Sequence, residues 1–191
     1  MEHQSRPRRR GRPSSTRAQN AIREAATRIF IERGFSAASI RDIATAAAVD
    51  PSIVIRHFGS KEGLFLETVS VDEGLRGITD GPLEGLGERI LERLVLRSGE
   101  EQQRVFRALV GAIDRAEVRT YFEQSANRHV SQPLSQRLEG PDPELRAELV
   151  TAQIAGLLMK LWVLEPPCED KARVERLVRI YGYALQVLID V

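Results

Sequence analysis

The 191-residue chain has few of the residue types that usually carry chemistry. Its only cysteine, Cys168, excludes an intramolecular disulfide and fits a reducing compartment. The histidines His3, His57 and His129 lie far apart in the sequence, and no Cys/His cluster has metal-ligand spacing. No Walker-type glycine loop or nucleophile elbow is present. We therefore expect no catalytic site, no metal and no cofactor, and we expect a protein that is not an enzyme.

Membrane and strand patterns are also scarce. No apolar run approaches the length of a membrane span, and the start of the chain lacks the apolar segment of a signal peptide. Alternating β-branched runs are nearly absent, and no internal repeat is evident. With 42% hydrophobic and 29% charged residues, the composition is ordinary for a globular helical protein. These patterns predict an all-α, cytoplasmic protein with one medium domain or two unequal units.

The net charge of +1 conceals a strong asymmetry along the chain. Residues 1–62 hold twelve Lys/Arg against six Asp/Glu, a balance of +6. The remainder holds sixteen against twenty-one, a balance of −5. A basic front and an acidic rear are expected when only one end of a protein meets a polyanion such as DNA.

Residues 39–61, SIRDIATAAAVDPSIVIRHFGSK, predict two short helices joined by a tight turn. Ser39 and Asp42 form a capping-box pattern, in which the hydroxyl and the carboxylate each accept a free backbone N–H. Asp50 followed by Pro51 is a second helix start, with an acceptor at the N-cap and a fixed φ at the first helical position. Two such helices make a helix-turn-helix, whose second member can enter the major groove of DNA.

The second of these helices has two different faces. Val54 and Phe58 are four residues apart and are expected to point into a small core. Ser52, Ile53 and Arg56 fall on the opposite side, where an exposed isoleucine can contact a thymine methyl group. The alternative is a plain three-helix scaffold with a solvated basic edge.

The region before the motif predicts an arm and a supporting helix. Residues 1–16 are polar and rich in Arg and Pro, which predicts disorder. Residues 8–13, RRRGRP, resemble the core of an AT-hook, which lies in a narrow minor groove; the alternative is a generic solvated tail. A first helix is expected from about Thr16 to Arg33, ending at Gly34. Its core face consists of Ile22, Ala26, Ile29 and Phe30.

The stretch GFSAASIRDIATAAAVDPSIVIRHFGSKEGLF resembles the DNA-binding domain of the TetR (tetracycline-repressor-like) regulators. The residues that match that pattern in order and spacing are Gly34, Phe35, Asp42, Ile43, Ala44, Val49, His57, Phe58, Ser60, Lys61 and Glu62. Two positions depart from it. Ala48 replaces the usual turn glycine, so the turn lacks the residue most tolerant of positive φ. Ile55 stands where a phosphate-contacting Tyr is common, which leaves more of the backbone contact to Arg56.

The resemblance implies a basic arm at 1–16, a three-helix DNA-binding domain at 17–62 and a helical effector-binding and dimerisation domain at 63–191. Base edges should be met by Ser52 and Ile53, and phosphates by Arg56, His57 and Lys61. The full set of expected DNA contacts is Arg8, Arg9, Arg10, Arg12, Arg41, Pro51, Ser52, Ile53, Ile55, Arg56, His57 and Lys61.

The second domain should begin with a helix that carries Leu64, Phe65 and Val69. In the TetR family this helix links effector binding to the spacing of the recognition helices. The glycines between residues 74 and 87 predict a mobile connection, and the helices that follow should be interrupted near Pro133.

The last two helices are expected to be the longest, and both are amphipathic. One carries Leu145, Leu149, Ala152, Gly156 and Met159; the other carries Val174, Leu177, Val178, Tyr181, Leu185, Leu188 and Ile189. These stripes fit either a four-helix bundle across a two-fold axis or the internal core of one subunit. The resemblance favours the homodimer.

Candidate residues for an effector pocket are Phe106, Leu109, Phe122, Met159 and Trp162, although plain core packing explains each of them more readily. Sparse charge there suggests an apolar or amphipathic small molecule. The sequence thus predicts a DNA-binding regulator, most readily a ligand-responsive repressor of a palindromic operator. The alternatives are a weakly specific architectural DNA binder without effector and a small-molecule binding protein.

Overall fold

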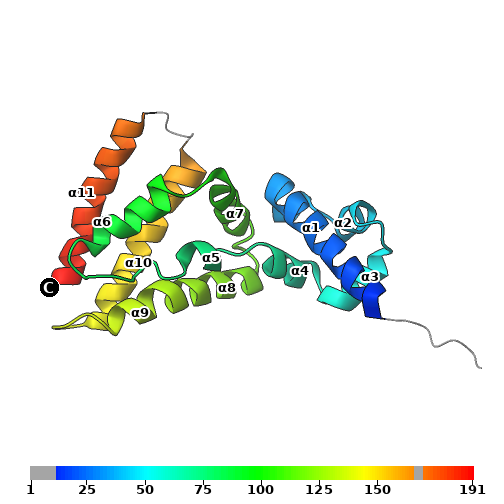
Figure 1. The fold of residues 1–191 in the computed structure, drawn as a ribbon, viewed down its shortest axis with the longest axis horizontal. Helices are drawn as coiled ribbons and strands as arrows, with labels where there is room; N and C mark the ends of the chain where they lie inside the picture. Colours follow the sequence, from blue (N-terminus) through cyan, green and yellow to red (C-terminus); the bar gives the residue numbers. More distant parts are fainter. Residues whose placement is uncertain (1–11, 166–169) are drawn as a thin grey trace, which may run out of the picture. The chain divides into compact units, whose positions relative to one another are not determined.

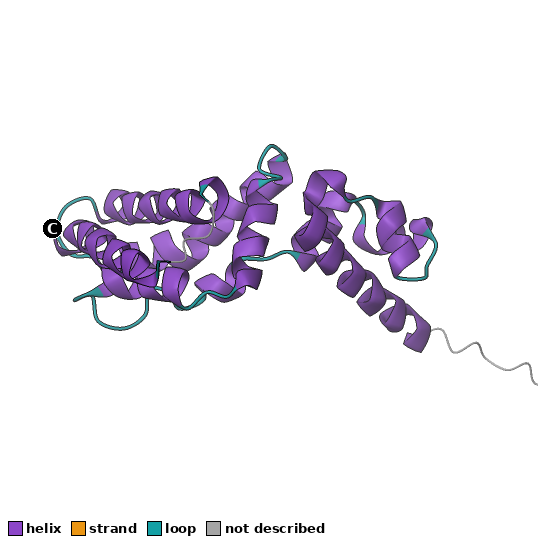
Figure 2. Ribbon diagram, turned by 90° about the horizontal axis from the view of Figure 1, so that it is seen from above, coloured by secondary structure: helices purple, strands orange, loops and turns teal. Residues whose placement is uncertain are grey.

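The computed structural model describes residues 12–165 and 170–191, with side chains from residue 15 onward. Within these ranges the chain forms helices and no strands, which confirms the predicted all-α class (Figures 1 and 2). The chain divides into two compact units, Met1–Thr68 and Val69–Val191. Each is described separately below.

The first unit contains the helix-turn-helix and its support. Its helices are α1 (Arg12–Ala37), α2 (Ile40–Ala46), α3 (Pro51–Phe58) and α4 (Lys61–Thr68). α1 begins at Arg12, earlier than the expected Thr16. Its regular part ends at Gly34, where φ is +75° and ψ is 169°, a conformation open mainly to glycine.

Three phenylalanines form the centre of the first unit. The ring of Phe65 on α4 meets Phe30 edge-on at 5.0 Å and Phe35 at 5.2 Å between centroids, the geometry that aromatic quadrupoles favour. The predicted core residues Ile22 and Ile29 are buried beside them. This cluster fixes α1 against α4 and gives α2 and α3 a rigid base.

The second unit contains more helices than the first, and α6, α8 and α10 each run on into a π-helical turn. Figure 1 shows the arrangement of its α-helices. Its elements are α5 (Asp72–Leu75), α6 (Leu86–Leu91), η1 (Glu92–Leu96), α7 (Glu100–Val110), α8 (Ala116–Ala126), η2 (Asn127–Ser131), α9 (Gln132–Ser135), α10 (Pro143–Met159), η3 (Lys160–Leu164) and α11 (Lys171–Asp190). The expected interruption near Pro133 is wrong. Pro133 lies in the first turn of α9, where a missing N–H is tolerated, and η2 joins α8 to α9 without a break.

Two glycines bring α6 and α11 into close contact. A Cβ on Gly182 would lie 2.7 Å from Glu88 Cα, and one on Gly87 would lie 2.9 Å from Gln186 N. The Gln186 side chain accepts a hydrogen bond from Gly87 N–H at 3.0 Å. Gly87, expected to break the chain, is therefore a buried contact residue inside α6.

The glycine-rich connection before α6, which the sequence predicts to be mobile, has four of its carbonyls bound by two arginine side chains. Arg93 donates to Gly77 O at 3.1 Å and to Arg76 O at 2.6 Å. Arg137 donates to the carbonyls of Thr79 and Gly81. Guanidinium groups thus satisfy carbonyls that would otherwise be free, and such charge-assisted bonds are the stronger kind.

The residues of α11 that were considered for a dimer interface lie inside the unit. Val178, Leu185 and Ile189 are buried in the core of the second unit. Leu177, Tyr181 and Leu188 pack against that core. The internal-core interpretation is therefore correct for this stripe.

Apolar residues nevertheless cover another face of both helices. Exposed positions on α10 and η3 recur at intervals of three, four or seven residues, which places them on one face, namely Leu145, Leu149, Ala152, Gly156 and Val163. On α11 Ile180 is 71% and Tyr183 75% exposed, and Val187 follows one turn later.

The helix Pro143–Leu164 is long and apolar enough to cross a membrane by length and composition alone, since its most apolar 18-residue window has a mean hydropathy of 1.5. This corrects the expectation that no apolar run approaches that length. Only 33% of its apolar window is buried within the chain.

Candidate nucleic-acid interface

The turn between α2 and α3 is closed by a Schellman motif that contains no glycine. Val49 N–H donates to Ala44 O at 3.0 Å, and Ala48 N–H donates to Thr45 O at 3.1 Å. This pattern needs a left-handed residue at its centre, and Ala48 takes that conformation with φ of +54°. The sequence correctly marks Ala48 as the unusual position of the turn.

Ser39 caps α2 as predicted, but the capping box is only half formed. The Ser39 hydroxyl accepts a bond from Asp42 N–H at 3.1 Å and donates to Asp42 Oδ2 at 2.7 Å. The carboxylate therefore binds the serine hydroxyl rather than the expected backbone N–H.

The start of α3 is fixed by its N-cap residue. Asp50 Oδ1 accepts Ser52 N–H at 2.8 Å and the Ser52 hydroxyl at 2.6 Å. The hydroxyl bond first, and the backbone bond second, lower the pKa of Asp50 from its ordinary value of 3.8. At the other end, Gly59 ends α3 with φ of +76°, and Ser60 Oγ caps α4 by accepting Gly63 N–H at 2.9 Å. The predicted caps are thus in place at both ends of α3.

The outer face of α3 differs from the prediction in one respect. Val54 is fully buried, as expected, and Pro51, Ser52 and Arg56 are exposed. The exposed isoleucine is Ile55, at 44%, whereas Ile53 is half-buried. Both flank Val54 by about 100° on the helix, so the pattern alone could not decide which one is shielded by its neighbours.

His57 is held by a residue that the sequence reasoning missed. The Gln19 side-chain amide on α1 lies 3.1 Å from His57 Nδ1. Both side chains are partly buried. No sequence signal could identify this pair, because the two residues are 38 positions apart and neither helix pattern marks Gln19.

The other residues predicted to contact DNA are Arg41, Lys61 and the arginines of the N-terminal arm. Arg41 is exposed on α2. The ammonium group of Lys61 lies 4.2 Å from the ring centroid of the buried Phe35, a cation–π contact within the protein. The side chains of Arg8, Arg9, Arg10 and Arg12, and with them the predicted minor-groove arm, lie outside the described residues.

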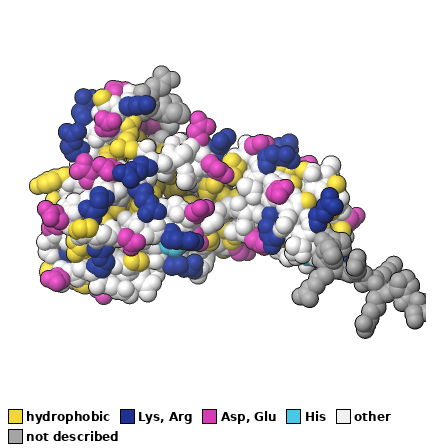
Figure 3. Space-filling model, viewed as in Figure 1, with side chains coloured by type: hydrophobic (Ala, Val, Ile, Leu, Met, Phe, Trp, Pro, Cys, Tyr) yellow, Lys and Arg dark blue, Asp and Glu magenta, His cyan; other side chains and the backbone are white. Residues whose placement is uncertain are grey.

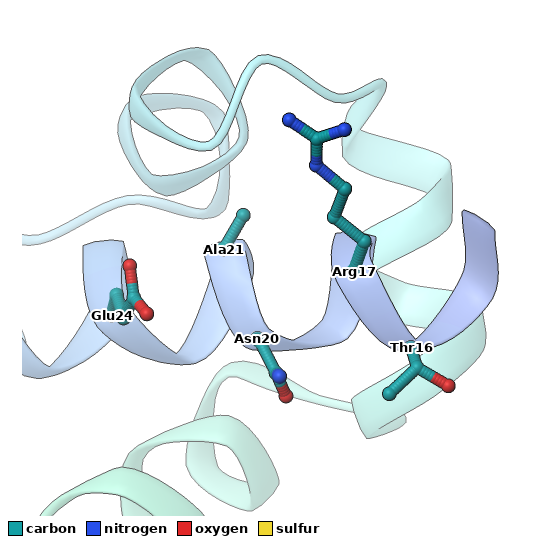
Figure 4. Close-up of a pocket in the computed structure, with 5 residues that line it drawn as sticks. All are labelled: Thr16, Arg17, Asn20, Ala21 and Glu24. Carbon is teal, nitrogen blue, oxygen red and sulfur yellow. The ribbon is translucent and has the colours of Figure 1, made fainter. Parts of the chain in front are cut away.

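An open depression of about 490 Å³ follows the first turns of α1, lined by Thr16, Arg17, Asn20, Ala21 and Glu24. Figure 4 shows that Arg17 and Ala21 point to one side of the helix, whereas Thr16 and Asn20 point to the other. The depression therefore runs around the helix surface. One of its lining residues is the exposed cation Arg17, near the start of α1, which the sequence patterns did not identify as a candidate site residue.

Of the five residues predicted to line an effector pocket, three lie together in the second unit. The Phe106 ring meets Trp162 at 5.3 Å and Phe122 at 5.8 Å between centroids. Leu109 is fully buried but is not a member of the core cluster that contains Phe106 and Trp162, and Met159 is half-buried. Within the described ranges, no group of His, Cys, Asp and Glu side chains is arranged to hold a metal ion.

A capped recognition helix on a rigid three-helix base, followed by a larger helical unit, defines a helix-turn-helix DNA-binding protein. Residues 22–68 match the family model for bacterial regulatory proteins of the tetR family. Residues 84–189 match the tetracyclin repressor-like C-terminal domain. The chain belongs to the TetR family of transcriptional regulators, which confirms the resemblance noted in the sequence.

Individual relatives agree with this assignment. A TetR-family regulator from Streptomyces coelicolor is 31% identical, with a TM-score of 0.62, over 94% of this chain and 98% of its own. The multidrug binding protein EbrR complexed with malachite green shares the fold at 18% identity, with a TM-score of 0.70, over 91% of this chain and 98% of its own. An HTH-type transcriptional repressor of Mycobacterium tuberculosis is 54% identical over 44 residues, which span 23% of this chain and 23% of that protein.

Proposed function

We propose that this regulator is a repressor that binds a palindromic operator as a homodimer in the cytoplasm and releases it when a small molecule binds the second unit. The observation that carries the DNA-binding part is the outer face of α3. Its N-terminus is fixed by Asp50, and Ser52, Ile55 and Arg56 are exposed on it. Serine and isoleucine suit base edges, and arginine suits phosphate. The name of the mycobacterial relative supports repression.

Dimerisation is supported by the exposed apolar faces of α10 and α11. A helix whose most apolar 18-residue window is only one-third buried within the chain needs a further apolar partner in water. Figure 3 shows hydrophobic side chains at the surface along α11, at the left of the view. On α10, Gly156 has open space where a Cβ would lie, which allows a second helix to approach closely. A second copy of the same two helices would complete a four-helix bundle.

Response to a ligand is supported by how the second unit holds its own first residues. Tyr121 Oη on α8 accepts Val71 N–H at 3.1 Å and lies 2.7 Å from Ser70 Oγ. His129 Nε2 on η2 lies 3.3 Å from Asp72 Oδ1. Ser70, Val71 and Asp72, which these side chains contact, directly follow α4 in the chain. A shift of α8 or η2 would therefore move the end of α4. A ligand that favours one position would change operator affinity by its differential binding to the two states.

The aromatic group of Phe106, Phe122 and Trp162 is the part of the second unit best suited to an apolar ligand. Beside these rings, the Arg107 side chain on α7 donates a hydrogen bond from Nη1 to Trp162 O on η3 at 3.2 Å. A protein of the same fold is described as multidrug binding, which supports an apolar or amphipathic effector for this chain.

The test is a competition experiment at fixed salt between a selected duplex and a scrambled duplex of equal length. A repressor of a defined operator should prefer the selected duplex by at least about 10³-fold. A ratio near one would instead favour the architectural alternative, in which phosphate contacts dominate. Addition of apolar compounds should then weaken binding to the selected duplex if the second unit is an effector domain.

A further inference from the structure

We propose that Gln19 is a positioning residue for DNA binding, which holds the His57 ring so that its Nε2–H is directed to a DNA phosphate. The inference rests on the proposed function, because it concerns the same interface. It assigns a role in DNA recognition to a residue of the supporting helix α1 that lies outside the helix-turn-helix itself.

The hydrogen bond defines the state of the imidazole. The Gln19 side chain is placed with its Nε2 amide group 3.1 Å from His57 Nδ1. In this orientation the amide donates and Nδ1 accepts, and in a neutral imidazole the proton is then on Nε2. With the opposite tautomer, Nε2 would present a lone pair to a phosphate oxygen, and no hydrogen bond would form.

The Gln19–His57 hydrogen bond lies where it can orient the His57 ring toward DNA. His57 lies in the last turn of α3, next to the exposed Arg56, and both members of the pair are partly shielded from water. Among the side chains that the structure describes, residues 15–165 and 170–191, no second hydrogen bond to the His57 ring is seen, so Nε2–H has no partner within that part of the chain. A ring held at one nitrogen and free at the other loses little rotational freedom when the phosphate arrives.

The same bond connects the supporting helix to the recognition helix. The Phe58 ring, which follows His57, is covered by the Arg23 guanidinium at 5.5 Å from α1. Gln19 and Arg23 are one helical turn apart, so α1 contacts two successive residues at the end of α3. We assign the polar contact to phosphate binding and the Arg23 contact to packing.

The test uses the full chain and the variant Gln19→Met, which keeps side-chain length but removes the donor. Long-range ¹H–¹⁵N NMR spectra of the free protein should show His57 Nδ1 unprotonated in the wild type and a mixture of tautomers in the variant. Affinity for DNA should fall by about two- to tenfold, the value expected for one hydrogen bond. Because the contact is to phosphate, a non-specific duplex should lose as much as a selected one.

Two comparisons make the result decisive. In a His57→Ala background, Gln19→Met should have no further effect on affinity, and Gln103→Met on α7 should have none in any background. Wild-type Nδ1 carrying the proton, an unchanged affinity in the variant, or an equal loss in the His57→Ala background would each overturn the proposal. Absence of a preferred duplex would instead contradict the proposed function, while the NMR result and the non-specific duplex would still test Gln19.

Discussion

The Ser52 hydroxyl donates a hydrogen bond of 2.6 Å to Asp50 Oδ1, the same oxygen that caps α3. The hydroxyl proton is therefore engaged within the protein, and Ser52 presents its lone pairs to solvent. A serine held in this way reads DNA as an acceptor. We expect it to prefer the amino groups of adenine or cytosine over the carbonyls of guanine or thymine.

This arrangement predicts a measurable change in acid titration. The Ser52 hydroxyl is the main cause of the lowered pKa of Asp50, so Ser52→Ala should raise that pKa toward 3.8. The cap stabilises the fold fully above pH 3.8 and loses its effect as the pH falls through the lower folded-state pKa, because protonation removes the charged acceptor. Carboxyl NMR titration of both proteins measures the shift. An identical pKa in the variant would contradict the assigned cause.

Replacement of Ala48 by glycine should stabilise the protein. The left-handed conformation costs an alanine about 1–2 kcal/mol, and glycine loses roughly 0.5–1 kcal/mol in chain entropy. With φ of +54° at this position, the expected net gain is about 0.5–1 kcal/mol, measured by urea unfolding. Ala48→Val is the matched control and should destabilise; a gain from valine would show that the turn is not strained.

Arg146 is a buried cation without a carboxylate partner in the described chain, since its hydrogen bonds go to four backbone carbonyls. Its guanidinium donates to Leu188 O and Ile189 O at 2.9 Å, to Glu139 O at 2.6 Å and to Pro141 O at 3.1 Å. Two of these acceptors lie in the last turn of α11, where the helix dipole favours a cation.

Arg146→Met should therefore lower the free energy of unfolding by about 3 kcal/mol, because four carbonyls lose the buried side chain that donates to them. Urea unfolding measures the loss. Arg179→Met, at an exposed position of α11, should change it by less than about 0.5 kcal/mol. Similar effects of the two variants would contradict the assigned role of Arg146.

A charge on the exposed apolar face of α11 should separate the proposed dimer. Tyr183 is 75% exposed, so Tyr183→Glu should leave the subunit folded but place an unpaired charge in the interface. Sedimentation analysis should show monomers, and operator affinity should fall at least tenfold. Arg119→Glu on the exposed face of α8 should remain dimeric. A dimeric Tyr183→Glu protein would assign the interface to other residues.

Two neighbouring exposed residues of α3, Ile55 and Arg56, should affect DNA binding in different ways. Arg56→Ala should weaken binding to all sequences and make the salt dependence shallower by about one phosphate contact. Ile55→Ala should change which base is preferred, because it removes an apolar contact rather than a charge. Binding titrations at several salt concentrations measure both. An unchanged salt slope in Arg56→Ala would show that Arg56 does not bind phosphate.

Short sequence patterns predict most of the helix starts and ends in the first unit. The caps at Ser39, Asp50 and Ser60 and the stop at Gly59 depend on residues within three positions of each other, so the sequence displays them directly. The Gln19–His57 bond, the Gly87–Gly182 contact and the Arg93 bonds to the glycine-rich connection join distant segments. A single sequence contains no signal for them.

The amphipathic helices show the same limit for the second unit. The pattern of α11 identified Val178 and Leu185 as one apolar face but could not tell core from interface. The exposed residues Ile180 and Tyr183 lie among arginines and were not recognised as a second face. Only the packed structure shows which apolar positions are already covered.

If two copies of α3 bind a two-fold symmetric site, selection of bound duplexes from a random pool at physiological salt will show it. We expect a palindromic consensus with half-sites about one helical turn apart. Enrichment of A·T-rich DNA without symmetry would contradict it, because binding would then depend on backbone and minor-groove contacts rather than on the recognition helices.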